Sequence, residues 1–407
     1  MMRRFGKRRQ LYTDARESRI NLYYEKISAG LGIMQVVIYL VLFSFVVLSF
    51  LKNTSFITYQ NFYYFFKDLS ASAEAVDVFA ADSVSYPTAE EQSFALYRNG
   101  LAVAGNQSVT VFTATGRQTV SQSINYKNPI AVGAGKYLLV YELGGTQYSV
   151  YNSYTQLYMG KSEFPILGAA VSDEGRFALI SRSESTNCTV SFYNDRFKLL
   201  RRYHRSGFVM DVSLDEQGDK LAMLISSAEN GRFMTRLEIC NVNESDSQDD
   251  SVQTVEIADA LALSCRFTKY GVSVLCENGF TFVDADGKVV TYESFSSNDV
   301  ISCFMNEDYS AFCLKKSSFS DEKQIIVFDK RGKMLYNETV EDRLIGFTVC
   351  DGVLFHYTST ELCRTELSDG TVRRKAYSVG ERQILAVDRD ELLVCSQQKA
   401  EYIRFDA

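Results

Sequence analysis

Short apolar runs alternate with turn residues from about residue 90 to the C-terminus. Many runs alternate apolar and polar side chains, and turn residues return roughly every 8–12 positions, which predicts an all-β fold. A hairpin recurs between paired runs. Its turns fall at Gly100, Gly135, Gly175, Gly218, Gly271, Tyr309, Gly352 and Asp390, at intervals of 35, 40, 43, 53, 38, 43 and 38 residues. A second hairpin follows in several units, at residues 113–117, 284–288, 329–333 and 368–371.

A period of about 40 residues with four strands in each unit predicts a β-propeller. The eight turns predict eight blades, and seven blades are the alternative if one unit is misread. The one long interval contains an acidic, polar insertion at 243–251. A solenoid would repeat at a similar length, but solenoid units usually carry helices, and no helical period is present here.

The last unit, residues 383–407, has room for only three strands. A propeller must close, because an open edge strand invites aggregation. We therefore expect residues 75–80, with the sequence AVDVFA, to supply the fourth strand from the N-terminal side.

Residues 27–51 form a run of 25 residues without a charged side chain. At about 1.5 Å per residue, a helix of this length would be roughly 37 Å long and could cross a hydrocarbon core of about 30 Å with some tilt. The alternative is a cleaved signal peptide. The run is longer than the apolar part of a signal peptide, which has roughly 7–15 residues, and no small-x-small cleavage site follows it. We therefore predict an uncleaved transmembrane helix.

Charge on the two sides of this run predicts its orientation. Residues 1–26 hold eight Lys or Arg and three acids, a net charge of +5, whereas the remaining residues hold 35 bases and 47 acids, a net charge of −12. The positive-inside rule then places the N-terminus in the cytoplasm. We expect a single-pass protein of the cell membrane with a cytoplasmic tail at 1–26, a transmembrane helix at 27–51, a juxtamembrane segment at 52–73 and an extracytoplasmic propeller at 74–407.

The juxtamembrane segment is rich in aromatic residues, which make up six of the eight residues 59–66. Tyr and Phe rings suit the boundary between lipid headgroups and water, so an interfacial helix is one interpretation. Packing of the same rings under the propeller is the other, and the sequence leaves both open.

Three segments carry a resemblance to a known family: ITYQNFYYFFKD at 57–68, VYNSY at 150–154 and AAVSD at 169–173. With this layout, the chain resembles a family of Gram-positive, clostridial-type membrane proteins that have one N-terminal span and a propeller-like ectodomain. The resemblance covers most of the chain and implies a bacterial source. That family has no established activity, so the resemblance implies no catalytic residue.

Candidate chemistry is sparse. The two histidines, His204 and His356, lie 152 residues apart and have no ligand at zinc-motif spacing. His204 belongs to the basic run 199–205, which is either a site for an anion or, as we favour, a solvated strand end. The sequence 284–287 begins like a calcium loop but lacks its other ligands, which favours a hairpin turn. We assign no catalytic, cofactor-binding or metal-binding residue, and we expect no cofactor.

All nine cysteines follow residue 187. Counting outward from the hairpin turns predicts that Cys265 lies opposite Cys276 and that Cys303 lies opposite Cys313. Directly opposed residues have Cβ atoms about 4.5–5.5 Å apart, which is too far for an unstrained disulfide. The pairs are therefore either labile disulfides or, as we favour, free thiols buried between strands.

The function that these features favour is a binding or scaffolding module at the cell surface, because propellers present loops from many blades around one rim. The alternatives are a sensor that signals to a membrane partner and a propeller enzyme with a site in the central channel. The expected partners are the lipid bilayer and other surface or membrane proteins. Nucleic acid is not expected, because the net charge after residue 26 is −12.

Overall fold

The computed structural model describes helical residues at 28, 31–32, 34–41 and 43–44, and then residues 82–405 except 98–99, 230, 243–251, 296–299, 316–321, 341–343 and 378–380. The chain divides into two compact units, Met1–Ala73 and Glu74–Ala407. No helix among the described residues has the length and hydropathy needed to cross a bilayer. Much of the predicted span at 27–51, the aromatic segment at 59–66 and the insertion at 243–251 lie outside the described residues.

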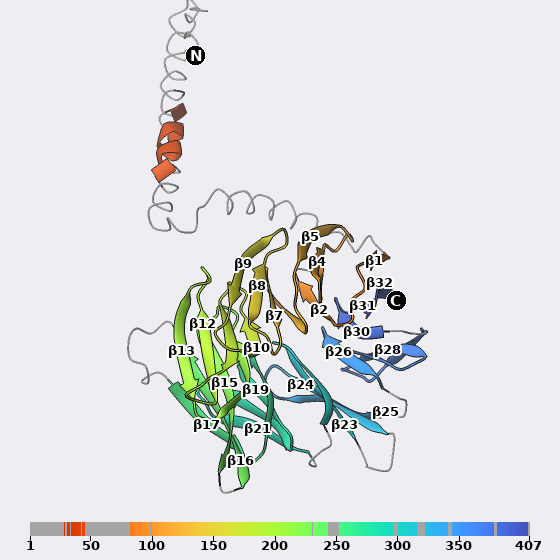
Figure 1. Ribbon diagram of the computed structural model, residues 1–407. Coiled ribbons are helices and arrows are strands. Elements are labelled where there is room, and N and C mark those ends of the chain that lie inside the picture. Colours follow the sequence, from red (N-terminus) through yellow and green to blue (C-terminus); the bar gives the residue numbers. More distant parts are fainter. Residues whose placement is uncertain are drawn as a thin grey trace, which may run out of the picture. The chain divides into compact units, whose positions relative to one another are not determined.

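The second unit is an eight-bladed β-propeller, as predicted, and each blade is a four-stranded antiparallel sheet (Figure 1). Blade one contains β2 (Gln92–Tyr97), β3 (Gly100–Gly105), β4 (Ser108–Phe112) and β5 (Gln118–Ser123). Blade two contains β6 (Pro129–Ala134), β7 (Tyr137–Glu142), β8 (Gln147–Tyr151) and β9 (Gln156–Lys161). Blade three contains β10 (Ile166–Val171), β11 (Phe177–Arg182), β12 (Cys188–Tyr193) and β13 (Leu199–Arg205). Blade four contains β14 (Phe208–Leu214), β15 (Lys220–Glu229), β16 (Arg232–Asn241) and β17 (Val252–Ala258).

The remaining blades continue the same order. Blade five contains β18 (Ala262–Thr268), β19 (Gly271–Cys276), β20 (Gly279–Asp284) and β21 (Val289–Ser294). Blade six contains β22 (Val300–Met305), β23 (Tyr309–Lys315), β24 (Lys323–Asp329) and β25 (Met334–Val340). Blade seven contains β26 (Gly346–Cys350), β27 (Val353–Tyr357), β28 (Glu361–Glu366) and β29 (Val372–Ala376). Blade eight contains β30 (Glu381–Ala386), β31 (Glu391–Ser396), β32 (Lys399–Arg404) and β1 (Ser83–Ser85).

A strand from the N-terminal side closes the ring, as predicted. The strand is β1, whose Val84 pairs with Ala400 on β32. β1 comes after residues 75–80, which we predicted from the sequence to form the closing strand. Residues 75–80 lie outside the described residues. A strand of only three residues has almost no periodic pattern, which explains why the choice of residues was wrong.

Asp and Gly residues set the second hairpin of the blades. In blade five, Asp284 Oδ1 accepts hydrogen bonds from the N–H groups of Asp286 and Lys288, and Gly287 has a φ of +78°. In blade six, Asp329 Oδ1 accepts from Arg331 and Lys333 in the same way. An Asp side chain that caps the turn and a Gly that adopts positive φ together specify this hairpin locally. The hairpin interpretation of 284–287 is therefore confirmed.

The core lies between neighbouring blades, where the faces of adjacent sheets pack together. Between blades five and six, the rings of Phe280, Phe312 and Phe328 form a fully buried group, with centroids 4.2 to 6.0 Å apart. Between blades eight and one, Val84 and Tyr86 join a buried cluster that includes residues of both blades. Closure is therefore a packing contact as well as a short ladder of hydrogen bonds.

The predicted cysteine pairings are wrong. Cys265 lies opposite Val274, because the hairpin loop is Lys269–Tyr270 and not the pair one residue later. Gly271 already belongs to β19, where a Cβ would clash with the carbonyl oxygen of Val283. Cys303 lies opposite Phe312, because Met305 pairs with Ser310, which leaves four residues between the paired positions.

All nine cysteines are free thiols, as the favoured interpretation stated. Seven of them are buried, Cys350 is half-buried and Cys303 is exposed. The buried thiols behave as small apolar side chains between sheets.

Candidate functional site

Strand order gives the propeller two distinct faces. We letter the strands of each blade A to D from the inner to the outer strand. Because neighbouring strands are antiparallel, the A–B and C–D turns lie on one face, which we call the turn face. The B–C hairpins and the D–A connections between blades lie on the opposite face. The eight A strands surround the central channel that joins the two faces.

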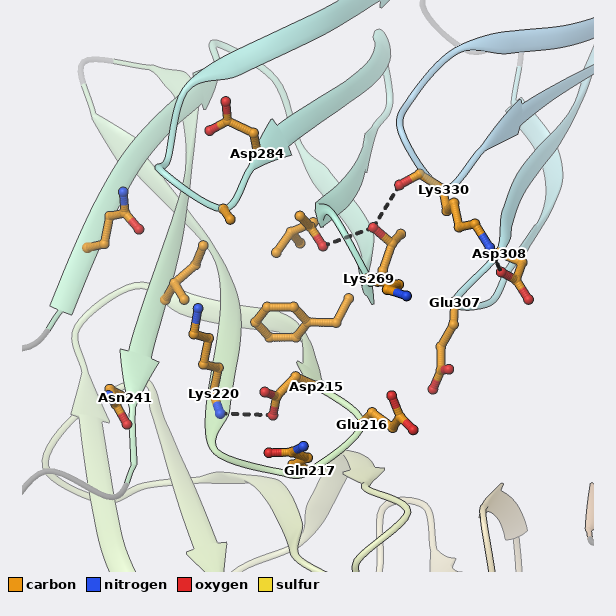
Figure 2. A pocket seen from close by; sticks show the side chains of 17 residues that line it. Asp215, Glu216, Gln217, Lys220, Asn241, Lys269, Asp284, Glu307, Asp308 and Lys330 are labelled. Carbon is orange, nitrogen blue, oxygen red and sulfur yellow. Dashed lines mark hydrogen bonds and ion pairs between the residues drawn. The ribbon is translucent and has the colours of Figure 1, made fainter.

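A pocket of about 550 Å³ opens on the turn face, and blades four, five and six contribute its walls (Figure 2). Its floor is apolar: Phe267 and Val272 are buried, and Ile239 is half-buried. Its charged lining residues are Asp215, Glu216, Asp284, Glu307, Asp308, Lys220, Lys269 and Lys330. Five acids and three lysines give this lining a net charge of −2.

Several of these charges are already engaged. Lys330 Nζ donates to Asp308 Oδ1 at 2.8 Å, Asp215 Oδ1 accepts the backbone N–H of Lys220, and Asp284 caps its own hairpin. Within the described part of the chain, the side chains of four other lining residues form no ion pair or hydrogen bond. These are Glu216, Glu307, Lys220 and Lys269.

Three carboxylates in the A–B turns of different blades interact electrostatically: Asp173, Glu216 and Glu307. Partial burial raises the pKa of Glu307, and the carboxylates of Asp173 and Glu216 raise it further. The pKa of Asp173 is raised by burial and by Glu216. Because these carboxylates repel one another, the group gains free energy when it binds a proton or another cation.

Polar groups continue into the channel. Asp211 on β14 accepts hydrogen bonds from Ser264 Oγ at 2.7 Å and from the N–H of Cys265 at 2.9 Å, which joins blades four and five. The Nε of Arg266 is buried and has no hydrogen-bond partner among the described residues. Cys303 is an exposed residue, but partial burial of its thiol raises the pKa of that thiol, with Asp211 adding to this effect and Arg266 opposing it.

The opposite face is apolar around the channel. The A strands of blades three to six each contain a β-bulge at the same place, at residues Leu167, Met210, Leu263 and Ile301. A bulge removes one residue from the ladder and turns its side chain away from the sheet. These four side chains are 37–47% exposed, and Ile345, just before β26 of blade seven, is 53% exposed.

Three more exposed apolar residues lie on the same face: Leu143 in the β7–β8 hairpin, Phe208 at the start of β14, and Phe233 on the extended β15–β16 hairpin. We call these eight residues the apolar face. Every other large apolar side chain that is exposed in the described part of the propeller lies on an outer strand.

Charged pairs surround the apolar face. Arg205 contacts Glu238 at 2.7 Å, and Arg374 contacts Glu361 at 2.8 Å. An apolar centre with a polar edge is the usual anatomy of a protein–protein interface.

The sequence-predicted sites are not brought together. His204 is on the outer strand β13, where its Nδ1 is 3.0 Å from Thr189 Oγ1, and His356 is buried on β27 in another blade. In the basic run 199–205, Arg202 pairs with Glu163 and Arg205 pairs with Glu238. These pairs support the interpretation of the run as a charged strand end. No group of three or more His, Cys, Asp or Glu among the described residues is arranged to hold a metal ion.

The sequence analysis missed both the pocket and the apolar face. The apolar face had a readable signal, because Leu167, Met210, Leu263, Ile301 and Ile345 follow one another at 43, 53, 38 and 44 residues, close to the intervals of the turns. The pocket had no such signal, because it combines turns and strands of three blades.

A family model described as a family of unknown function, DUF5711, matches residues 79–405. The chain belongs to this family. Comparison with curated proteins gives no match. The DUF5711 match and the propeller agree with the layout that the resemblance implied for the ectodomain, and the source and the span stay predictions.

Solved structures similar to this DUF5711 chain are other propellers. Sqt1 from Chaetomium thermophilum has a TM-score of 0.54 at 13% identity, covering 81% of this chain and 100% of that one. BamB from Moraxella catarrhalis has a TM-score of 0.53 at 10% identity, covering 80% and 97%. The WD40 domain of SCAP from fission yeast has a TM-score of 0.50 at 11% identity, covering 79% and 97%. At these identities the likeness shows the fold alone.

Proposed function

We propose that this DUF5711 chain is a membrane-anchored, extracytoplasmic binding module that docks a partner protein on its apolar face. The observation that carries the proposal is the repeated exposure of Leu167, Met210, Leu263 and Ile301 at one bulge position in four successive blades. Isolated exposed apolar residues are ordinary, but a contiguous patch of several hundred Å² is typical of an interaction site.

The chemistry of the surroundings favours a protein over a lipid surface. A peripheral membrane face carries an excess of Lys and Arg for anionic headgroups, whereas two arginines at the edge of this face pair with acids, as Arg205–Glu238 and Arg374–Glu361. The partner is therefore expected to present an apolar segment with polar residues of both signs around it. Anchoring rests on the uncharged run 27–51, and the orientation rests on the basic tail before it.

Site-specific photo-crosslinking in intact cells tests the docking face. We would place benzoylphenylalanine at Met210 or Ile301 on the apolar face, and at Val290, which is 57% exposed on the outer strand β21, as the matched control. We expect one discrete protein adduct from the first two positions and none from Val290. Leu263→Asp should abolish the adduct, whereas Val290→Asp should leave it unchanged.

Equal adducts at all three positions, or adducts to lipid only, would refute docking of a protein on this face. Protease added to protoplasts tests the orientation separately. The propeller should be digested while the cells stay intact, and full protection would reverse the predicted topology.

A further inference from the structure

The pocket on the turn face has the size and rigidity of a ligand site. Its volume of about 550 Å³ lies within the range of sites for small organic ligands, roughly 300–1,000 Å³. Hydrogen bonds fix its walls across blade boundaries. The N–H of Phe267 donates to Ser213 Oγ at 2.9 Å, and Thr268 Oγ1 donates to the carbonyl of Lys330 at 2.9 Å. Three blades therefore hold the pocket in one shape, which reduces the entropy lost on binding.

The two ends of the pocket differ in charge. Figure 2 shows Glu216 and Glu307 together on one side, and Lys220 with Asn241 on the other side. Among the described residues, neither carboxylate has an ion pair, and neither does the Lys220 ammonium group. Buried apolar side chains, including Phe267, form the floor of the same pocket.

A complementary ligand would have a cation at one end, an anion at the other and an apolar body between them. We propose that this pocket binds a short zwitterionic peptide whose ammonium group lies between Glu216 and Glu307 and whose carboxylate lies at Lys220. The raised pKa of Glu307 agrees with the cation end, because an ammonium group would relieve the repulsion among the carboxylates there. A peptide of about three residues also supplies one central side chain to cover Phe267.

Lys269 and Arg266 are the internal cations that could compete for the cation end. Lys269 lines the pocket, but it forms no ion pair with either carboxylate among the described residues. Arg266 lowers the pKa of Glu307, but burial and three neighbouring carboxylates outweigh it, so the pKa stays raised. The cation position is therefore open to a ligand. This inference is independent of the proposed function, because the pocket and the apolar face lie on opposite faces of the propeller.

Calorimetric titration of the full chain in detergent micelles with alanyl-phenylalanyl-alanine tests the proposal. The same peptide with an acetylated N-terminus lacks the ammonium group, and the C-terminal amide lacks the carboxylate. We expect saturable binding at millimolar peptide, with Kd raised about tenfold by acetylation, because a charge-assisted hydrogen bond is lost. Amidation should raise Kd in the same direction.

Variants connect each peptide end to its residue. Glu307→Gln should raise Kd for the free peptide about tenfold but leave Kd for the acetylated peptide unchanged, because the contact is already absent. Lys220→Met should raise Kd for the free peptide but leave Kd for the C-terminal amide unchanged, because the amide already lacks the carboxylate. Glu174→Gln is the control, since Glu174 is an exposed acid in the equivalent turn of blade three and does not line the pocket.

Absence of saturable binding at millimolar free peptide would overturn the proposal. It would also be overturned if the free and acetylated peptides bound equally, or if Glu174→Gln weakened binding as much as Glu307→Gln. Met210→Asp, on the apolar face, should leave peptide binding unchanged. Failure of the crosslinking experiment would therefore be distinguishable from failure of this one.

Discussion

Tyr86 joins the first and last blades, so its truncation should weaken the closed ring more than any loss of a single hydrogen bond. Its side chain is 6% exposed, and its ring lies 5.7 Å from that of Phe94 and 6.5 Å from that of Phe112 in blade one. Its hydroxyl donates to the carbonyl of Ser396 in blade eight at 2.8 Å. The residue thus contributes apolar burial to one blade and a hydrogen bond to the other.

Two substitutions separate these contributions. Tyr86→Phe keeps the ring and loses the hydroxyl, so it should cost about 0.5–1.5 kcal/mol, with the Ser396 carbonyl left without this donor. Tyr86→Ala also removes the buried ring, and truncation of a large buried aromatic side chain costs about 3–5 kcal/mol. The expected difference between the two variants is therefore at least about 1.5 kcal/mol.

Urea unfolding of the propeller, residues 74–407, followed by circular dichroism measures both values from the midpoint and the slope. A soluble Tyr86→Ala variant should also associate with time, because a loosened β1 exposes the edge of β32. The reasoning is refuted if Tyr86→Ala and Tyr86→Phe unfold within about 0.5 kcal/mol of each other, since closure would then not depend on the buried ring.

Three further outcomes are expected. Phe312→Ala, in the buried group between blades five and six, should lower the free energy of unfolding by about 3–5 kcal/mol. Phe208→Ser, on the apolar face, should change it by less than about 0.5 kcal/mol. Equal effects in urea unfolding would contradict the assignment of core and surface. The folded-state pKa of Glu307 is raised, so its contribution to stability is present at low pH and is lost as the pH rises through that value. Glu307→Gln should therefore gain stability relative to the unmodified chain as the pH rises above about pH 4, by less than about 1 kcal/mol because the group is solvent-accessible. A gain that does not depend on pH would count against the carboxylate cluster. Thiol titration without reductant should find nine thiols in denaturant and a single fast-reacting thiol in the folded chain. Because the pKa of Cys303 is raised, the reaction rate of this thiol should keep rising at pH values above the ordinary thiol pKa. A fast-reacting thiol that persists in Cys303→Ser would show that another cysteine is responsible.

Local chemistry explains which features of the fold the sequence predicted. All eight A–B hairpins were found because turn residues specify their own geometry within a few positions, as Gly175 and Gly218 do with their positive φ. The cysteine register failed because it depends on whether Gly271 belongs to the loop or to β19, and a glycine is compatible with both. Gly271 lies in β19 and packs closely against the backbone of Val283 in the neighbouring strand β20. The sequence around Gly271 contains no information about this contact.

The candidate site was harder to predict for a related reason. Bulged residues such as Met210 and Leu263 interrupt the alternating pattern of their strands, so they cannot be recognised from one strand alone. Their recurrence becomes visible when the sequences of successive blades are aligned. The pocket combines Glu216 from blade four with Glu307 from blade six, and their proximity follows from the closed ring alone.

The way the ring closes also has a consequence for biosynthesis. Tyr86 and Ser396 are 310 residues apart, yet they are partners in the folded chain. At roughly 5–20 residues per second, a ribosome needs about 15–60 s to make the segment between them. During that time β1 has left the ribosome and its partner β32 does not exist, so the seven earlier blades can form while the ring stays open. Completion of this propeller therefore waits until β32 has been made and the three-residue strand β1 has paired with it.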